Sequence, residues 1–275
     1  MPETPRRTLV YRHGVTTRIT HWINVVAISF LLLSGLQIFN AHPALYWGAK
    51  STFAEPWLSM TARPKGGEII GVTKVGGLAV ETTGVLGYSG KAGREEARGF
   101  PAWATIPSFR SLADGRRWHF FFAWIFAANV AVYLAAAAVG GHLRRDLIPT
   151  RDQLSPRHVL HEIATHARLK FPKGEAARRY NVLQKGAYLG VVILLLPLMV
   201  ATGLTMSPGF NAIAPWMVDL FGGRQSARTI HFLSASLIVA FIVVHLAMVV
   251  LSGLWNNVRS MITGRYAIET EGAAP

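Results

Sequence analysis

The sequence predicts an all-α integral membrane protein, a four-transmembrane-helix bundle with a long outer loop and an inner amphipathic segment. Charged residues make up only 15% of its 275 residues, against roughly 25% in soluble domains, while hydrophobic residues make up 51%. The net charge of +14 is therefore carried by a chain poor in charge, which argues against a soluble nucleic-acid binder. Cysteine is absent, which excludes disulfides, thiolate-held iron–sulfur clusters and zinc sites with cysteine ligands.

Four stretches lack Asp, Glu, Lys and Arg for long enough to cross a bilayer, which takes roughly 20 helical residues. We treat residues 1–275 as one membrane domain with spans at about 19–39, 118–141, 186–206 and 229–255. Pro197 lies inside the third span, where the loss of its N–H group predicts a kink.

The distribution of Lys and Arg predicts the direction of the spans. The segment before the first span carries four of these residues, the connection 142–185 carries ten and the C-terminal tail carries two. The opposite side carries ten in residues 40–117 and two before the fourth span, but the long loop counts for less under this rule. We therefore expect a bacterial inner-membrane protein with both termini in the cytoplasm, a periplasmic loop 40–117 and a cytoplasmic loop 142–185.

The two long connections differ in pattern. Residues 66–84 are dense in glycine and alternate between polar and apolar, which predicts a short hairpin within the outer loop. Residues 153–169, in the inner loop, have the pattern of an amphipathic helix on the membrane surface.

Four histidines lie within the spans: His21, His119, His231 and His245. Ionisable residues inside a membrane are costly and are functional candidates. His231 and His245 are 14 residues apart, so on one helix they face nearly the same side and lie about 21 Å apart along the axis. One of them is therefore expected near each surface of the bilayer.

The direction of each span sorts the four histidines by depth. His21 and His245 are expected near the cytoplasmic surface and form the inner pair, whereas His119 and His231 form the outer pair. Each pair joins two helices at one level, which is the arrangement of bis-histidine haem ligation in a bundle. Polar contacts between helices and a proton relay are the alternatives for any single histidine. Four depth-matched histidines favour haem.

Three arginines, Arg18, Arg116 and Arg228, each precede one of these histidines by three residues and so share its helix face. They are candidates for binding haem propionates, and the alternative is that they anchor the span ends at the membrane surface. Small residues near the ligands could let a porphyrin approach the backbone, although such residues are common in membrane helices: Gly35, Gly203 and Ala235.

Several motifs resemble a known family. The segment RITHWINVV, the Trp-His pair in the second span and H-x13-H in the fourth are similar to the di-haem membrane cytochrome b family, which includes the cytochrome b subunits of nickel hydrogenase and formate dehydrogenase and the bacterial b561-like proteins. The resemblance extends from Tyr11 to Gly264. More narrowly, five segments resemble the branch labelled thiosulfate reductase cytochrome b subunit: SGLQIFNAHPALYWG, FPAWATIPS, GRRWHFFFAW, YNVLQKGAYL and FGGRQSARTIHF.

The resemblance implies two non-covalent b haems whose iron is bound by His21, His119, His231 and His245. It also implies electron exchange between the quinone pool and a periplasmic redox subunit, such as a molybdopterin enzyme or a cytochrome. The outer loop is much longer here than in the formate dehydrogenase and hydrogenase subunits.

Our first functional hypothesis is an electron-transfer subunit of an oxidoreductase complex, in contact with membrane lipid and without a catalytic residue of its own. The second is a free-standing quinone-linked b561-like oxidoreductase acting on a small oxidant such as a ferric chelate or superoxide. The third is a haem-free proton-coupled transporter or membrane anchor. For the first, we expect the quinone near the inner pair, with Tyr11, His13 and Asn24 as candidate contacts.

Overall fold

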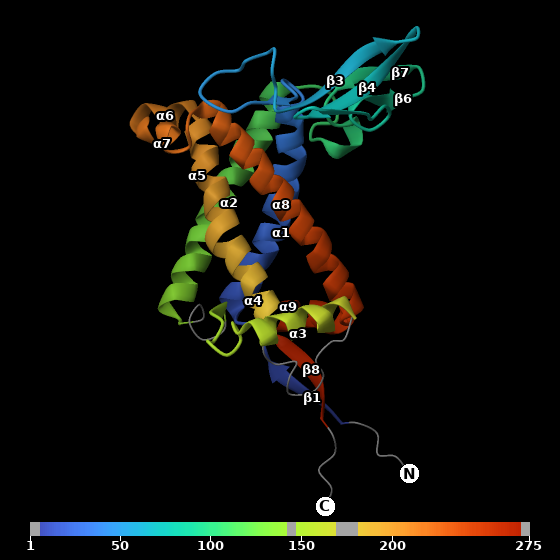
Figure 1. Cartoon of the computed structure of the whole chain (residues 1–275). Helices are drawn as coiled ribbons and strands as arrows, with labels where there is room; N and C mark the ends of the chain where they lie inside the picture. The colour runs from blue at the N-terminus through green and yellow to red at the C-terminus, as the bar shows by residue number, and fades with distance from the viewer. Residues whose placement is uncertain (1–5, 142–146, 169–180, 271–275) are drawn as a thin grey trace, which may run out of the picture. The chain divides into compact units, whose positions relative to one another are not determined.

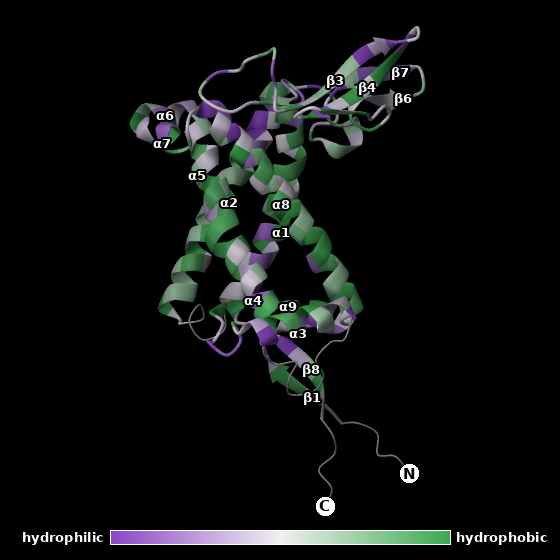
Figure 2. Cartoon of the chain, viewed as in Figure 1, coloured by the Kyte–Doolittle hydropathy of each residue, from purple (hydrophilic) through white to green (hydrophobic). Residues whose placement is uncertain are grey.

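Four helices of the computed structural model are long and apolar enough to cross a membrane, which confirms the predicted fold class. The structure describes residues 6–141, 147–168 and 181–270 (Figure 1). The spanning helices are α1 (Val15–Phe39), α2 (Leu112–Val139), the run Val182–Met206 and α8 (Arg224–Leu251). Figure 2 shows that these helices are coloured mainly as hydrophobic.

All four spanning helices begin before the charge-free stretches because polar residues also form their first turns. At the start of α2, the Ser111 hydroxyl accepts the Asp114 N–H at 3.2 Å and donates to the Asp114 carboxylate at 2.7 Å. This reciprocal bonding satisfies groups that a helix start leaves open. The helix α8 ends at Leu251, earlier than the expected 255, because Gly253 adopts a left-handed backbone conformation with φ of 113°.

The third spanning run is irregular ahead of Pro197. It consists of α4 (Val182–Leu189), a π-helical segment η4 (Gly190–Leu195) and α5 (Leu196–Met206). The N–H of Leu196 donates to the Val191 carbonyl, five residues earlier. The irregularity expected at Pro197 therefore takes the form of a π-helical turn, which is a known response of spanning helices to proline.

The chain divides into two compact units, which we describe separately. The first comprises residues 1–23, 129–197 and 237–275. Its terminal strands β1 (Arg6–Tyr11) and β8 (Arg265–Thr270) pair antiparallel, with Tyr11 opposite Arg265 (Figure 1). Residues 6–11 and 265–270 therefore lie side by side, which agrees with an even number of spans between them.

Two further helices belong to the first unit: α9 (Leu254–Thr263) and α3 (Pro156–Ala167). The first turns of α1 are tied to the end of α9, because the Trp22 indole N–H donates to the Met261 carbonyl at 3.1 Å. The helix α3 confirms that the predicted amphipathic segment 153–169 is helical. Residue 169 of that segment lies outside the described residues.

The second unit comprises residues 24–128 and 198–236, and it contains the outer loop. The predicted hairpin is present as β4 and β5, but it belongs to a four-stranded antiparallel sheet in the order β2-β3-β4-β5. A separate pair, β6-β7, lies beside this sheet (Figure 1). The strands are β2 (Ala44–Leu45), β3 (Leu58–Lys65), β4 (Glu68–Val75), β5 (Leu78–Glu81), β6 (Gly87–Lys91) and β7 (Arg94–Arg98).

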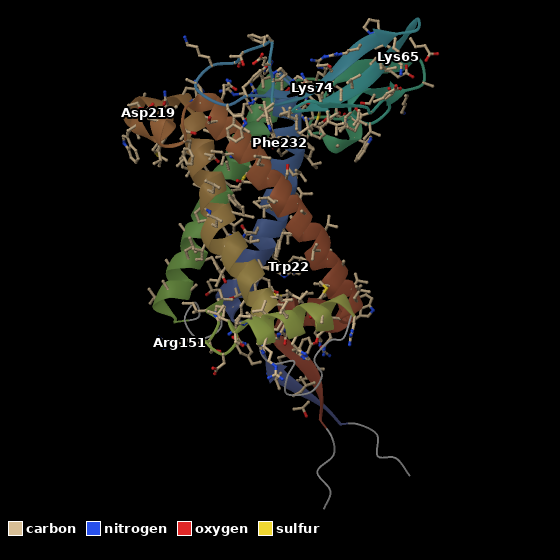
Figure 3. The ribbon with its side chains drawn as sticks, viewed as in Figure 1. Trp22, Lys65, Lys74, Arg151, Asp219 and Phe232 are labelled. Carbon is tan, nitrogen blue, oxygen red and sulfur yellow. The ribbon has the colours of Figure 1, made fainter. Side chains whose placement is uncertain are left out.

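A small hydrophobic core joins this sheet to the end of α1. Its buried members are Phe39, Leu45, Leu58 and Met60. Two charged residues of the β3–β4 hairpin, Lys65 and Lys74, are labelled in Figure 3. The loop also exposes large apolar side chains such as Leu78 and Trp103. It is therefore a folded layer with a mixed surface, where the sequence predicted only one hairpin.

Three short helices complete the second unit: η1 (Ala102–Ala104), α6 (Pro208–Ile213) and α7 (Trp216–Leu220). The segment around η1 is organised by Arg98, which is only 2% exposed. Its guanidinium donates to Glu96 at 2.5 Å, to the Phe100 carbonyl at 2.6 Å and to the Thr105 hydroxyl at 3.0 Å. A buried guanidinium is stabilised only when its donors are paired in this way.

Candidate functional site

The structure brings the four intramembrane histidines together in the two expected pairs. In the first unit, the ring centroids of His21 and His245 lie 6.4 Å apart, with an interplanar angle of 58°. In the second unit, those of His119 and His231 lie 6.3 Å apart at 64°. Each pair joins two helices, α1 with α8 and α2 with α8.

Both separations suit two imidazoles on opposite sides of one metal ion. Two metal–nitrogen bonds of about 2 Å and two ring radii of about 1.2 Å give a centroid separation of roughly 6.4 Å. Among the described residues, no group of three or more His, Cys, Asp or Glu side chains could hold a metal ion. A metal bound between two rings would therefore have to bring its remaining ligands, as porphyrin iron does.

In the outer pair, a hydroxyl holds the ring of His119. Its Nδ1 lies 3.1 Å from the Oγ of Ser34 on α1. The adjacent Gly35 leaves room for the ring, because a Cβ atom at that position would lie 3.3 Å from the His119 Cε1.

The ring of His231 meets the same arrangement on another helix. Its Nδ1 lies 2.9 Å from the Oγ1 of Thr202 on α5, and a Cβ at Gly203 would lie 3.4 Å from its Cε1. Sequence reasoning selected both glycines as small residues but missed Ser34 and Thr202. The repeated dipeptides Ser-Gly and Thr-Gly, each followed by Leu, are the signal that could have found them.

The inner pair has different surroundings. The buried Nδ1 of His21 has no hydrogen-bond partner among the residues that the structure describes. Its ring packs edge-on against Trp22 at 5.3 Å, and the ring of His245 stacks on Phe241 at 5.7 Å. The inner rings are therefore positioned by aromatic contacts.

A backbone contact holds the helix turn just before His21. The side-chain amide of Asn129 on α2 donates to the Thr20 carbonyl at 2.8 Å. Asn129 and Thr20 are 6% and 4% exposed. This bond ties α1 to α2 within the first unit.

The three candidate propionate partners make protein contacts. Arg18 donates to the Ile262 carbonyl at 2.5 Å, and its buried Nε has no partner within the described part of the chain. Arg116 lies 5.4 Å from the ring centre of Phe120. Arg228 donates to the His42 carbonyl at 2.5 Å. A guanidinium has five N–H donors, so each arginine keeps donors that a propionate could use. The propionate role stays a prediction.

The segment after α1 is hydrogen bonded to the start of α8. Sequence reasoning missed these bonds because the partners lie about 180 residues apart. Thr229 donates to the Tyr46 carbonyl at 2.6 Å, and the Gly48 N–H donates to the Ser226 hydroxyl at 2.7 Å. These bonds connect the base of the outer sheet to the helix that carries His231.

A histidine and a tyrosine pair within this segment. The Nε2 of His42 lies 3.1 Å from the Tyr46 hydroxyl. Burial, and secondly the Arg228 guanidinium, hold the pKa of His42 below its ordinary value. Burial raises the pKa of Tyr46, while Arg228 acts in the opposite direction. Both groups are therefore uncharged near neutral pH.

The candidate quinone residues are spread over both units. Tyr11 lies in β1 and is 66% exposed, and the backbone of His13 packs near Gly264 in the first unit. Asn24 lies on α1 in the second unit. Their role in quinone binding stays a prediction.

Comparison with known proteins gives two matches. A family profile described as prokaryotic cytochrome b561 matches residues 12–264. The chain is also 26% identical over 240 residues to a protein of Azospira oryzae described as a putative protein-methionine-sulfoxide reductase subunit, YedZ1; the match covers 87% of this chain and 90% of that protein. No solved structure matches.

Proposed function

Because the chain belongs to the prokaryotic cytochrome b561 family, we propose that it is a di-haem cytochrome carrying electrons between the quinone pool and a periplasmic redox subunit. Family membership makes it a multi-pass membrane electron-transfer protein and implies that it binds haem b. The number of haems, their ligands, the quinone and the partner are the parts that we propose.

The proposal rests on one observation, the spacing of the rings in the two histidine pairs. Two separate pairs have ring separations of 6.4 and 6.3 Å, and each matches the span of two imidazoles on one metal ion. Helix–helix contacts through histidine would require no such spacing, and they would not favour the same spacing twice. The absence of cysteine means that the haem is held without covalent thioether bonds.

The chain's own residues would hold and shield these sites. The four imidazoles would bind iron through a ring nitrogen, and the hydroxyls of Ser34 and Thr202 would fix the outer rings. Aromatic side chains beside the ligands, such as Phe120 and Phe241, would exclude water. A haem bound at each pair supplies a one-electron iron centre.

We place the redox partner on the outer loop. The relative from Azospira oryzae is described as a reductase subunit, which supports a periplasmic oxidoreductase such as a molybdopterin enzyme as the partner. A periplasmic cytochrome is the other candidate. The folded loop offers charged strands and the side chain of Trp103, which is 82% exposed. The free-standing oxidoreductase remains the second candidate, because the same haems could serve a small oxidant.

We place the quinone near the inner pair, against the first and fourth spanning helices. The outer side is taken by the partner, so the inner side remains for a lipid-soluble substrate. A quinone-site inhibitor should then perturb the optical spectrum of the inner haem. A perturbation confined to the outer haem would contradict this position.

The test of the proposed function combines spectroscopy with purification from the native membrane. A reduced-minus-oxidised spectrum should show b-type haem, and a periplasmic oxidoreductase subunit should co-purify. A haem-free protein would support the transporter or anchor. A haem protein that purifies alone and reduces a ferric chelate would support the free-standing oxidoreductase.

A further inference from the structure

The two histidines of the outer pair contact the same two-residue motif on two different helices. Ser34 and Gly35 on α1 face His119, and Thr202 and Gly203 on α5 face His231. In both cases the hydroxyl residue approaches Nδ1 and the glycine lies beside Cε1. Two neighbouring atoms of each ring, Nδ1 and Cε1, thus meet corresponding residues, which the mere presence of small residues would not produce.

The hydroxyl groups define which nitrogen of each ring carries the proton. A hydroxyl has a single hydrogen, and Ser34 donates it to the Phe30 carbonyl at 2.6 Å. Thr202 donates its hydrogen to the Leu198 carbonyl, also at 2.6 Å. Each oxygen can therefore only accept from the histidine, so Nδ1 must be the protonated nitrogen.

A second backbone carbonyl supports the same assignment. The Ser34 hydroxyl also lies 3.3 Å from the Leu31 carbonyl, and the Thr202 hydroxyl lies 3.3 Å from the Met199 carbonyl. Each hydroxyl hydrogen therefore points to backbone acceptors, which leaves the hydroxyl oxygen to accept from the ring. With Nδ1 protonated, Nε2 of a neutral imidazole carries the free lone pair that a metal requires.

The glycines set how closely each ring lies against its helix. A Cβ at Gly35 would lie 3.3 Å from the His119 Cε1, which is tighter than most Cβ contacts, so alanine there would displace the ring. A Cβ at Gly203 would lie 3.4 Å from the His231 Cε1, at the near limit of ordinary van der Waals contact. The hydroxyl and the glycine thus act on neighbouring atoms of one imidazole. One fixes its proton and the other fixes its position.

We propose that Ser34-Gly35 and Thr202-Gly203 are matched positioning motifs that hold His119 and His231 with Nε2 free for iron, and that their hydroxyls lower the reduction potential of the outer haem. This inference rests on the proposed function. An imidazole that donates through Nδ1 is a more basic ligand and favours the oxidised, more positive metal. In the inner pair, the Nδ1 of His21 has no corresponding bond within the described residues.

The experiment is a redox titration of the full-length, haem-loaded protein carrying Thr202→Val or Ser34→Ala. The component that disappears in His231→Ala identifies the outer haem. In both hydroxyl variants, the reduced-to-oxidised ratio of this component at the wild-type midpoint should rise about two- to tenfold, the range expected for one lost hydrogen bond. A tenfold change corresponds to about 59 mV for one electron. The inner component should keep its midpoint.

Matched variants separate the hydroxyl's effect from a general loss of packing. Ser29→Ala on α1 and Ser236→Ala on α8 remove hydroxyls that also bond a carbonyl four residues earlier but touch no histidine, so they should leave both midpoints unchanged. Thr202→Ser keeps the acceptor and should retain the wild-type midpoint. If Thr202→Val fails to bind haem, retention in Thr202→Ser supports the motif.

Several results would overturn the inference. These are an unchanged outer midpoint in both hydroxyl variants, an equal shift in both haems or in the control variants, and a loss of haem in Thr202→Ser as well. If His231→Ala instead keeps both haems, the proposed function itself fails, so the two failures are distinguishable.

Discussion

The inner and outer histidine pairs have nearly the same spacing but are held by different means. Hydroxyls bond the outer rings at Nδ1, and glycines lie directly beside them. Aromatic side chains contact the inner rings, and a buried amide holds the backbone one residue before His21. Equal spacing would bind the same metal at both pairs, while the different surroundings would give the two centres different potentials.

The largest effect is expected from removing the histidines themselves, because this distinguishes the inner pair from the outer pair. His21→Ala and His245→Ala should each lose the same haem, and His119→Ala and His231→Ala should each lose the other. The two pairs lie in different compact units, so removing one ligand should leave the second site assembled. Optical spectra and haem content of the four membrane-inserted variants measure this. Loss of the same component in His21→Ala and His119→Ala would contradict the pairing.

Adding a methyl group at Gly35 should affect only the outer centre. In Gly35→Ala, the new Cβ would lie 3.3 Å from the His119 Cε1, so the ring would have to shift by a few tenths of an ångström. We expect roughly tenfold to hundredfold weaker haem retention at the outer site, as for other changes in the groups that orient a ligand. Competition with a haem-binding apoprotein would measure it. Gly186→Ala is the control, because a Cβ there would meet nothing within 4 Å, and an equal effect from it would refute the explanation.

The corresponding test of the inner pair, which lies in the first unit, removes the side-chain amide of Asn129. Asn129→Leu keeps a side chain that branches at Cγ, although a larger one, and removes the donor to the Thr20 carbonyl. We expect a loss of about 1–3 kcal/mol in the free energy of unfolding, the usual cost of a buried broken hydrogen bond. Thermal unfolding followed at the inner haem's absorption band would show it. A preferential loss of the outer haem would contradict this assignment.

The smallest expected effect is a pH dependence outside the spans. Because the pKa of His42 in the folded protein lies below its ordinary value of 6.5, the unfolded chain binds a proton more readily just below that pH. The contribution of His42 to the free energy of unfolding is therefore complete above pH 6.5. It is lost as the pH falls through the pKa of His42 in the folded protein. The melting temperature of the wild type should fall more between pH 7.5 and 5.5 than that of His42→Gln. Parallel curves for the two proteins would show that His42 does not contribute.

Local sequence patterns were sufficient for the spans and for the histidine pairs. The charge-free stretches located four helices, since hydropathy depends only on neighbouring residues. The span direction sorted the histidines, because antiparallel helices place His21 and His119 at opposite depths. The structure brings together the pairs that this sorting predicted.

Features that depend on distant partners were not predictable in the same way. The pairing of β1 with β8 joins the two ends of the chain, and alternation within either strand does not identify the other. The hydroxyl of Thr202 has a role only because His231, 29 residues later, returns to face it. The outer sheet also exceeded the prediction, because Gly-rich strands such as β6 have little of the β-branched character that marks a strand.

The most direct test of the central claim is the haem content of the purified wild-type chain. Haem measured as its pyridine complex, against protein measured by amino-acid analysis, should give two b haems per chain, and acidified organic solvent should extract all of it because no thioether bond is available. A fully loaded protein with one haem per chain would contradict the account, because one of the two histidine pairs would then have no metal to hold.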